Sequence, residues 1–403
     1  MFFKLKDEVF LVEGACNSCI YHLPNNSLYQ IDRDTYDFIN DVLSRDVTDS
    51  EEISLLEDLV QMDVLERCES SSDRINIDEY LRHQRPFSLV WVELTNICNL
   101  RCIHCYNEND EIRKQTLSLA DFKHIVDELQ KNDVNKVTLI GGEPFVIDRE
   151  ILFLMMDYLS PKVNSFEIFT NGTLSKARDL QEIRNRYPNA SIATSLHSYI
   201  ESEHEKVTCR GGSYKKTLST IRTANRIGLP IRYVGTLMAT IDIGEELDFG
   251  KPSRRDFVRL SGRASLRLYN KSLLKEKAII KDNFVFSNLK ERLWDTYNDS
   301  CYATHLYISS NMDVYPCPME RRICHGNLRN THLRDILKSE ILNMSKKDVN
   351  ECCECEYRYI CLDCRPDSIT NGIADKPWFC TYKPLQGEWE DFDQFADNLG
   401  VTE

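Results

Sequence analysis

The stretch TNICNLRCIHCYN, residues 95–107, places three cysteines within eight residues of one another. It follows the apolar segment FSLVWVEL, residues 87–94, which predicts a buried β-strand that ends where the cysteines begin. Three thiolates on so short a loop can bind three irons of a 4Fe-4S cube and leave the fourth iron without a protein ligand. Cys98, Cys102 and Cys105 therefore predict a cluster with one open iron, because a structural zinc site would need a fourth ligand that the loop does not offer.

Apolar strand patterns alternate with helical patterns beyond this loop, as they do in parallel βα units. The first helical segment opens with a capping signal, Ser118 with Asp121 three residues later, and carries its apolar residues on one face. Six such units form an incomplete barrel, in which the loops at the C-terminal strand ends hold the chemistry. The predicted fold class is α/β, with a partial (β/α)6 TIM-like barrel at its centre. The strand candidates are residues 87–94, 136–140, 165–170, 191–196, 231–237 and 256–260.

The C-x3-C-x2-C loop resembles the signature of the radical S-adenosylmethionine (SAM) superfamily, in which an aromatic residue precedes the third cysteine. His104 stands at that position and offers a planar ring to the adenine side of SAM. The resemblance implies that SAM chelates the open iron and that its reductive cleavage releases a 5'-deoxyadenosyl radical, which abstracts a hydrogen from the substrate. The protein would orient the cofactor and shield the radical from water.

A second motif, IGGEP, ends the second predicted strand. Its glycines let the backbone approach a ligand closely, and its carboxylate can accept a hydrogen bond from an ammonium group. Placed one βα unit after the cysteines, it resembles the superfamily's motif for the amino group of SAM. Asn171 and Ser195, at the ends of strands three and four, stand where the family often contacts the ribose or the methionine carboxylate; an ordinary turn or strand role is the alternative for both. The expected SAM-binding residues are His104, Gly141, Gly142, Glu143, Pro144, Asn171 and Ser195.

A second group of cysteines lies in the C-terminal quarter of the chain. Its spacing resembles the SPASM extension of radical SAM enzymes that mostly modify peptides or proteins, which implies two auxiliary 4Fe-4S clusters. Met312 departs from that pattern, because a glycine is usual there. One cluster would lack a ligand, so either an iron is open or Cys324 completes the set; a pair of zinc ribbons is the alternative, since zinc tolerates the same spacing. By position, Cys352, Cys355, Cys361 and Cys380 would bind one auxiliary cluster, and Cys301, Cys317 and Cys364 the other.

The N-terminal part reads as three short strands followed by two amphipathic helices, a winged-helix-like arrangement. It resembles the peptide-recognition element fused to many maturases of ribosomally made peptides, in which an extended leader peptide adds a strand to a sheet edge. A winged helix can also bind DNA, but the acidic sequence at residues 46–70 argues against contact with phosphates. The expected domains are a leader-recognition domain (residues 1–80), a radical SAM barrel (residues 85–285) and a SPASM domain (residues 295–403).

Composition narrows the choice of partners. The 403 residues carry a formal net charge of −14 and no basic block, which argues against a nucleic-acid partner. The N-terminal segment has no signal-peptide core, and no apolar run approaches the length of a membrane span. We therefore expect a cytoplasmic protein without a membrane partner.

Together these features predict a radical SAM peptide maturase that uses SAM and three 4Fe-4S clusters, acts on a precursor peptide with a leader, and receives electrons from a reductant such as flavodoxin or ferredoxin. The closing segment looks like the subgroup of SPASM maturases that accompany ATP-grasp ligases. A thioether or carbon-carbon crosslink is the expected product, with oxidation and epimerisation also open because no motif fixes the choice. The alternatives are a sulfatase-type maturase that oxidises a Cys or Ser of a protein, and a zinc-ribbon scaffold or binding protein.

Overall fold

A nine-stranded sheet in the order β11-β10-β9-β8-β7-β6-β12-β13-β14 organises the computed structural model. Strands β6 to β11 follow one another in sequence and pair in parallel, which confirms the predicted α/β class and partial barrel. They are β6 (Leu89–Thr95), β7 (Lys136–Gly141), β8 (Ser165–Thr170), β9 (Ala190–Ser195), β10 (Ile231–Leu237) and β11 (Arg254–Phe257). The structure describes residues 1–70, 76–81, 89–107, 114–247, 252–284, 288–298, 305–338, 344–370 and 372–403.

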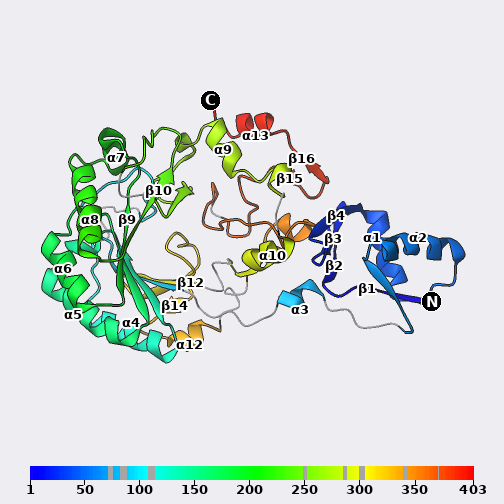
Figure 1. Cartoon of the computed structure of the whole chain (residues 1–403), viewed down its shortest axis with the longest axis horizontal. Coiled ribbons are helices and arrows are strands. Elements are labelled where there is room, and N and C mark those ends of the chain that lie inside the picture. The colour runs from blue at the N-terminus through cyan, green and yellow to red at the C-terminus, as the bar shows by residue number, and fades with distance from the viewer. Residues whose placement is uncertain are drawn as a thin grey trace.

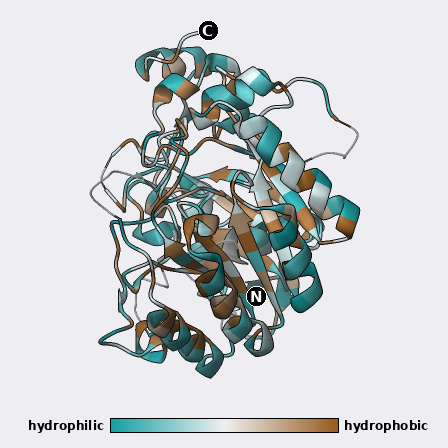
Figure 2. Ribbon diagram, turned by 90° about the vertical axis from the view of Figure 1, so that its left-hand side faces the viewer, coloured by the Kyte–Doolittle hydropathy of each residue, from teal (hydrophilic) through white to brown (hydrophobic). Residues whose placement is uncertain are grey.

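Helices cover the outside of this sheet, as Figure 1 shows. The first begins as its capping signal predicts, because the Ser118 hydroxyl accepts a hydrogen bond from the Asp121 amide at 3.0 Å. The last ends at Gly228, whose φ of +68° favours glycine. Apolar residues gather on the strands and on the helix faces turned toward them (Figure 2), and they form the largest core cluster. The helices are α4 (Leu119–Lys131), α5 (Arg149–Leu159), α6 (Ala177–Arg186), α7 (Glu201–Thr208) and α8 (Ser213–Ile227).

The C-terminal cysteine-rich segment begins inside the barrel sheet. Strand β12 (His305–Ile308) pairs in parallel with β6, and β13 (Asp313–Tyr315) and β14 (Gly326–Asn327) continue the sheet in antiparallel fashion. The sheet therefore runs across the boundary expected near residue 295. The turn between β12 and β13 contains Met312, which is buried with a φ of +68°. The backbone thus keeps the conformation that suits the usual glycine, although the residue is methionine.

The remaining C-terminal residues lie between the barrel and the N-terminal part (Figure 1). Lys277, on α9, and Asp367 form a buried ion pair that ties the end of the barrel to this region. The Asp367 carboxylate also accepts hydrogen bonds from the Leu260 amide at 2.8 Å and the Trp378 indole at 2.9 Å. The elements here are α9 (Lys271–Lys277), α10 (Leu289–Asn298), α12 (Leu333–Ile336), β15 (Tyr382–Lys383), β16 (Glu388–Trp389) and α13 (Phe392–Asn398).

The N-terminal module, residues 1–70, contains a three-stranded sheet covered on both faces. One face, including Val9 and Ile20, packs on its own helices; the other, including Phe10 and Tyr21, packs on the C-terminal residues around Tyr357. All residues of β4 are at least partly exposed, whereas three of the four in β2 are buried, so β4 is the more open edge. The elements are β1 (Phe2–Leu5), β2 (Val9–Val12), β3 (Asn17–His22), β4 (Ser27–Asp32), α1 (Arg33–Val42), α2 (Ser50–Gln61) and β5 (Leu65–Cys68), followed by α3 (Ile77–Leu81).

Membrane insertion is not supported by any helix in the described ranges, since none combines the length and apolar character that crossing a bilayer requires.

Candidate functional site

The cysteine loop leaves the C-terminal end of β6 and is fixed by backbone hydrogen bonds on two sides. The amides of Arg101 and Ile103 donate to carbonyls at the end of α7, at 3.2 and 2.9 Å. On the other side the Arg263 amide donates to the Cys105 carbonyl at 3.0 Å, and its guanidinium Nε donates to the Cys102 carbonyl at 3.0 Å. The loop is therefore held in a defined conformation by elements distant in sequence.

The three loop thiols face one cavity and lie close enough to influence one another. Burial raises the pKa of Cys98 to about 11. Burial, followed by the neighbouring thiols of Cys105 and Cys98, raises the pKa of Cys102 strongly. A bound metal removes that penalty, because metal ligation deprotonates a thiol. Three thiols on one loop, aimed at one cavity, are a donor set that fits a 4Fe-4S cluster with an open iron.

The structure also brings Cys209, at the end of α7, near Cys102. This neighbour could not be predicted from the sequence, because more than a hundred residues separate the two thiols. No three His, Cys, Asp or Glu side chains in the described part of the chain converge as the ligands of a single metal ion would.

The two glycines of the GGEP motif bring β7 against the backbone that enters the cysteine loop. A Cβ added at Gly141 would lie 2.3 Å from the Thr95 carbonyl oxygen, and one at Gly142 would lie 2.3 Å from that of Ile97. The Gly142 amide donates to Thr95 at 2.7 Å and the Glu143 amide to Ile97 at 2.9 Å. The sequence predicts a close approach to a ligand, whereas the approach seen in the structure is to the cysteine loop; both glycines also line the cavity.

Glu143 is fully buried behind the cavity wall, where its carboxylate joins the ends of two strands. It accepts hydrogen bonds from the Phe145 amide at 3.0 Å, the Thr170 hydroxyl at 2.6 Å and the Asn171 amide at 2.7 Å. Burial raises its pKa despite these donors. Pro144 begins the short 3-10 turn η1 (Pro144–Val146), which the Glu143 side chain caps. Glu143 thus positions the loop through its amide, and neither Glu143 nor Pro144 contributes to the cavity lining.

Asn171 contacts the cysteine loop directly. Its side-chain amide donates to the Cys98 thiol at 3.8 Å and to the Asn99 side chain at 2.9 Å. An amide N–H near a ligating thiolate stabilises its negative charge. Asn171 and Ser195, which ends β9, both line the same cavity as the loop thiols.

Three histidines form a row along the cavity wall. The rings of His104 and His197 meet edge to face with centroids 4.7 Å apart, and those of His197 and His204 stack at 5.6 Å. Burial lowers the pKa of His104 and of His204 to about 4, so these imidazoles are neutral at physiological pH. Of the three, only His104 was predicted from the sequence, because it lies within the cysteine motif. His197 and His204 belong to no motif that would single them out.

Gly262 and Arg263 are further residues that the sequence did not single out. Gly262 has a φ of +59°, and a Cβ there would lie 2.3 Å from the Cys105 carbonyl oxygen. The Gly-Arg pair after the last barrel strand therefore contacts the cysteine loop in addition to α7. The only sequence feature that could have indicated this contact is Gly262 itself, a glycine shortly after the last barrel strand.

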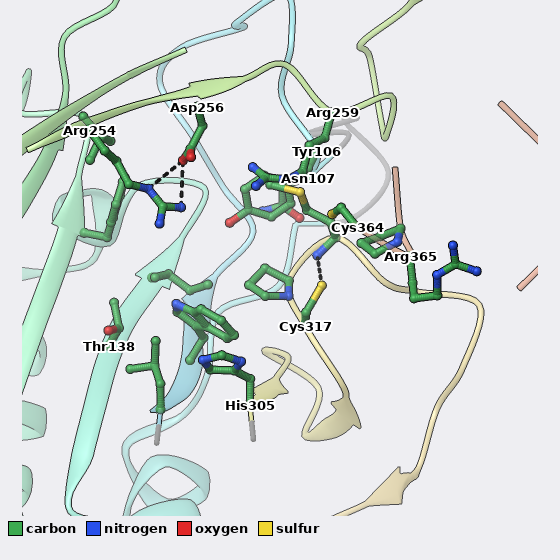
Figure 3. A pocket seen from close by; sticks show the side chains of 18 of the residues that line it. Tyr106, Asn107, Thr138, Arg254, Asp256, Arg259, His305, Cys317, Cys364 and Arg365 are labelled. Carbon is green, nitrogen blue, oxygen red and sulfur yellow. Dashed lines mark hydrogen bonds and ion pairs between the residues drawn. The ribbon is translucent and has the colours of Figure 1, made fainter. Parts of the chain in front are cut away.

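The C-terminal thiols separate into two groups. Cys317 and Cys364 line the large cavity. Figure 3 shows Cys364 near Arg259, whose positive charge opposes the rise that burial causes in the pKa of Cys364. Cys324 is exposed, with its sulfur 3.5 Å from the Gly326 carbonyl, and lines neither cavity. Cys301 lies outside the described residues. A second, smaller cavity is lined by the quartet Cys352, Cys355, Cys361 and Cys380.

The large cavity measures about 1680 Å³ and joins the loop thiols to Cys317, Cys361 and Cys364 across the open side of the barrel. Thiol groups at the C-terminal edge of a parallel barrel, facing more thiols from a cysteine-rich extension, define the class as iron-sulfur proteins built on a partial TIM barrel.

Comparison with known families identifies this class. Residues 92–249 match the Radical SAM superfamily, and residues 301–365 match SPASM, an iron-sulfur cluster-binding domain. The chain belongs to the radical SAM superfamily of enzymes and carries a SPASM domain.

Similar proteins include two from Bacillus subtilis (strain 168). The antilisterial bacteriocin subtilosin biosynthesis protein AlbA is 34% identical over 142 residues, which are 35% of this chain and 31% of AlbA. The sporulation killing factor maturation protein SkfB is 27% identical over 157 residues, 39% of this chain and 36% of SkfB. The chain thus spans about a third of the length of these relatives. Among solved structures, Streptococcus suis SuiB bound to precursor peptide SuiA matches with a TM-score of 0.53 and 15% identity, over 93% of this chain and 100% of SuiB, which shows a shared fold.

Proposed function

We propose that this chain is a radical SAM peptide maturase that abstracts a hydrogen from a ribosomally made precursor peptide and forms a thioether or carbon-carbon crosslink. The cavity carries this proposal. Its volume of about 1680 Å³ exceeds the roughly 300–1,000 Å³ of a usual small-molecule pocket and leaves space for a peptide segment beside SAM. Thiol groups stand at both ends of that space, where a bound segment would pass between two cluster sites.

Cys98, Cys102 and Cys105 would hold the SAM-binding cluster, and the two C-terminal thiol groups would hold two auxiliary clusters. When bound, the loop cluster and SAM would supply the 5'-deoxyadenosyl radical. The chain's own residues fix the loop through Arg263 and Glu143, and Asn171 donates to the Cys98 thiol. The barrel wall, including the neutral His104, shields the reacting atoms from water.

The N-terminal module supports a peptide substrate rather than a small molecule. Because both faces of its sheet are covered, the exposed edge of β4 is the surface left for an extended leader peptide. AlbA and SkfB are named for subtilosin biosynthesis and sporulation killing factor maturation, and SuiB was solved with its precursor peptide. A sulfatase-type maturase is less well supported, because such enzymes usually lack this module. A flavodoxin or ferredoxin would serve as reductant.

The test is to incubate the reduced enzyme and SAM with a short peptide encoded beside the gene, and to measure peptide mass and 5'-deoxyadenosine in the same sample. Loss of two hydrogens in step with deoxyadenosine supports a crosslinking maturase. Deoxyadenosine without any change in the peptide would contradict that substrate and redirect attention to the protein-oxidising alternative.

Metal content separates the maturase from a zinc-ribbon scaffold. Anaerobically prepared protein should contain about twelve irons per chain, as three cubes require, whereas zinc with little iron would contradict the proposal. The variant Cys98→Ala/Cys102→Ala should lose about four irons and all SAM cleavage. Cys68→Ala, in the N-terminal module, is the matched control and should keep both.

A further inference from the structure

The cavity around the C-terminal cysteine quartet is lined by cations as well as thiols. Lys346, Arg358 and Lys376 share its wall with the four sulfurs, and no carboxylate residue among those described is part of that wall. Burial raises the pKa of Cys352 most, and the neighbouring Cys361 and Cys380 thiols raise it further, so these three thiols lie close to one another. Four thiols around one small cavity fit the auxiliary cluster proposed there.

Lys346 makes the most direct cationic contact with the quartet. Its ammonium nitrogen donates to the Cys361 sulfur at 3.9 Å and to an Asp363 carboxylate oxygen at 2.8 Å. The side chain is only 11% exposed, so solvent screens this charge weakly. Lys376, 18% exposed, approaches Cys380 and donates to the Tyr382 carbonyl at 2.7 Å.

The surrounding carboxylates balance only part of this positive charge. Asp363 is shared between Lys346 and Arg365, and Glu351, which pairs with Lys376 at 3.1 Å, is 43% exposed. Glu356, next to Cys355, is buried, and its carboxylate accepts from the Tyr382 hydroxyl at 2.6 Å and from the Gln30 amide at 3.0 Å.

The cysteine loop has a different environment. Its Cys98 thiol faces the neutral amide of Asn171, with the Glu143 carboxylate behind it; the Arg263 guanidinium lies near Cys102 but bonds to that residue's carbonyl. A cluster with four thiolates is anionic, and reduction adds one negative charge, which a nearby buried cation stabilises.

We propose that Lys346, assisted by Lys376, is a positioning residue that raises the reduction potential of the cluster held by Cys352, Cys355, Cys361 and Cys380. This inference rests on the proposed function, since it requires a cluster at the quartet. The two lysine charges make the quartet cluster easier to reduce than neutral neighbours would, which suits a site that receives an electron.

The test is a redox titration monitored by electron paramagnetic resonance. It is made in a background in which the three loop cysteines and Cys317 and Cys364 are all replaced by alanine, so that neither the loop cluster nor the other auxiliary cluster contributes signal or iron. Lys346→Gln should lower the ratio of reduced to oxidised quartet cluster at a fixed potential about tenfold, which corresponds to 59 mV for one electron. Lys346→Arg should restore most of the loss.

Lys347→Gln is the matched control, because the neighbouring ammonium pairs with Asp78 and lies over the Tyr359 ring instead of the quartet. An unchanged potential in Lys346→Gln with full iron content, or an equal shift in Lys347→Gln, would overturn the inference. If Lys346→Gln fails to bind iron, Lys376→Gln gives the same measurement. If the cysteine-to-alanine background with Lys346 intact contains no iron, the assignment of a cluster to the quartet is wrong. This outcome differs from an unchanged potential, which would overturn only the inference about Lys346.

Discussion

Replacing Gly142 with alanine should disable the cysteine loop without unfolding the barrel. The added methyl carbon would stand 2.3 Å from the Ile97 carbonyl oxygen, 2.5 Å from the Ile97 carbonyl carbon and 2.7 Å from the Asn96 oxygen. All three atoms are backbone, so no side chain can rotate away. Ordinary contact begins near 3.4 Å, so the backbone just before Cys98 must move by about 1 Å. A displacement of that size at a reacting centre costs about 100-fold in rate.

The assay is 5'-deoxyadenosine formation by reconstituted enzyme, with iron content and thermal unfolding measured on the same preparation. Gly142→Ala should reduce deoxyadenosine about 100-fold while destabilising the fold by only about 1–3 kcal/mol. Gly211→Ala is the control, because a Cβ there meets nothing nearer than a Glu205 carboxylate oxygen at 4.0 Å. Wild-type deoxyadenosine formation by Gly142→Ala would refute the argument that this contact positions the loop.

Three further predictions concern stability, each measured by urea unfolding. Asp367→Ala should destabilise the fold by about 3–5 kcal/mol, because it leaves the buried Lys277 ammonium, the Leu260 amide and the Trp378 indole without their acceptor. Lys277→Met/Asp367→Leu should recover only the part of that loss that comes from the unpaired ammonium. Burial opposes ionisation of Glu128, but hydrogen bonds, the strongest from Lys131, lower its pKa to about 2. Its contribution to the free energy of unfolding is therefore complete above pH 4.5 and is lost as the pH falls toward 2. Glu128→Gln should make the free energy of unfolding depend less on pH in this range. Met312→Gly should relieve about 1–2 kcal/mol of left-handed backbone strain but lose about 2–5 kcal/mol of buried packing, so a stabilised variant would contradict the buried role of this side chain.

Local chemistry made much of the barrel predictable. The cap at Ser118 and the apolar strand runs each depend on neighbouring residues, so the sequence alone locates them. The cysteine loop was predictable for the same reason, since three of its proposed ligands lie within eight residues. The last barrel strand was placed two residues late: β11 is Arg254–Phe257, because its register pairs Leu237 with Phe257 and the Leu237 carbonyl then receives the Val258 amide.

Features that depend on distant contacts were not predictable. Nothing in the short segment of β12 indicates that it pairs with β6, because both the register and the partner are set by tertiary packing. The neighbours of the cysteine loop, Arg263 and Cys209, reach it only once the barrel closes. The residue at 312 gave no sign of its positive φ, because methionine rarely adopts a left-handed conformation; the only indication was the glycine usual at this position in the SPASM pattern.

The pairing of β12 with β6 has a consequence for biosynthesis. Until residues 305–308 leave the ribosome, β6 carries a row of backbone groups without its final partner, beside the apolar side chains of Val90 and Val92. Such an edge is a template for pairing with another nascent chain. A chain truncated before β12 should therefore aggregate rather than yield a separate barrel. Stable assembly of the cluster proposed at Cys98, Cys102 and Cys105 should accordingly follow synthesis of the C-terminal region, although these cysteines are translated early.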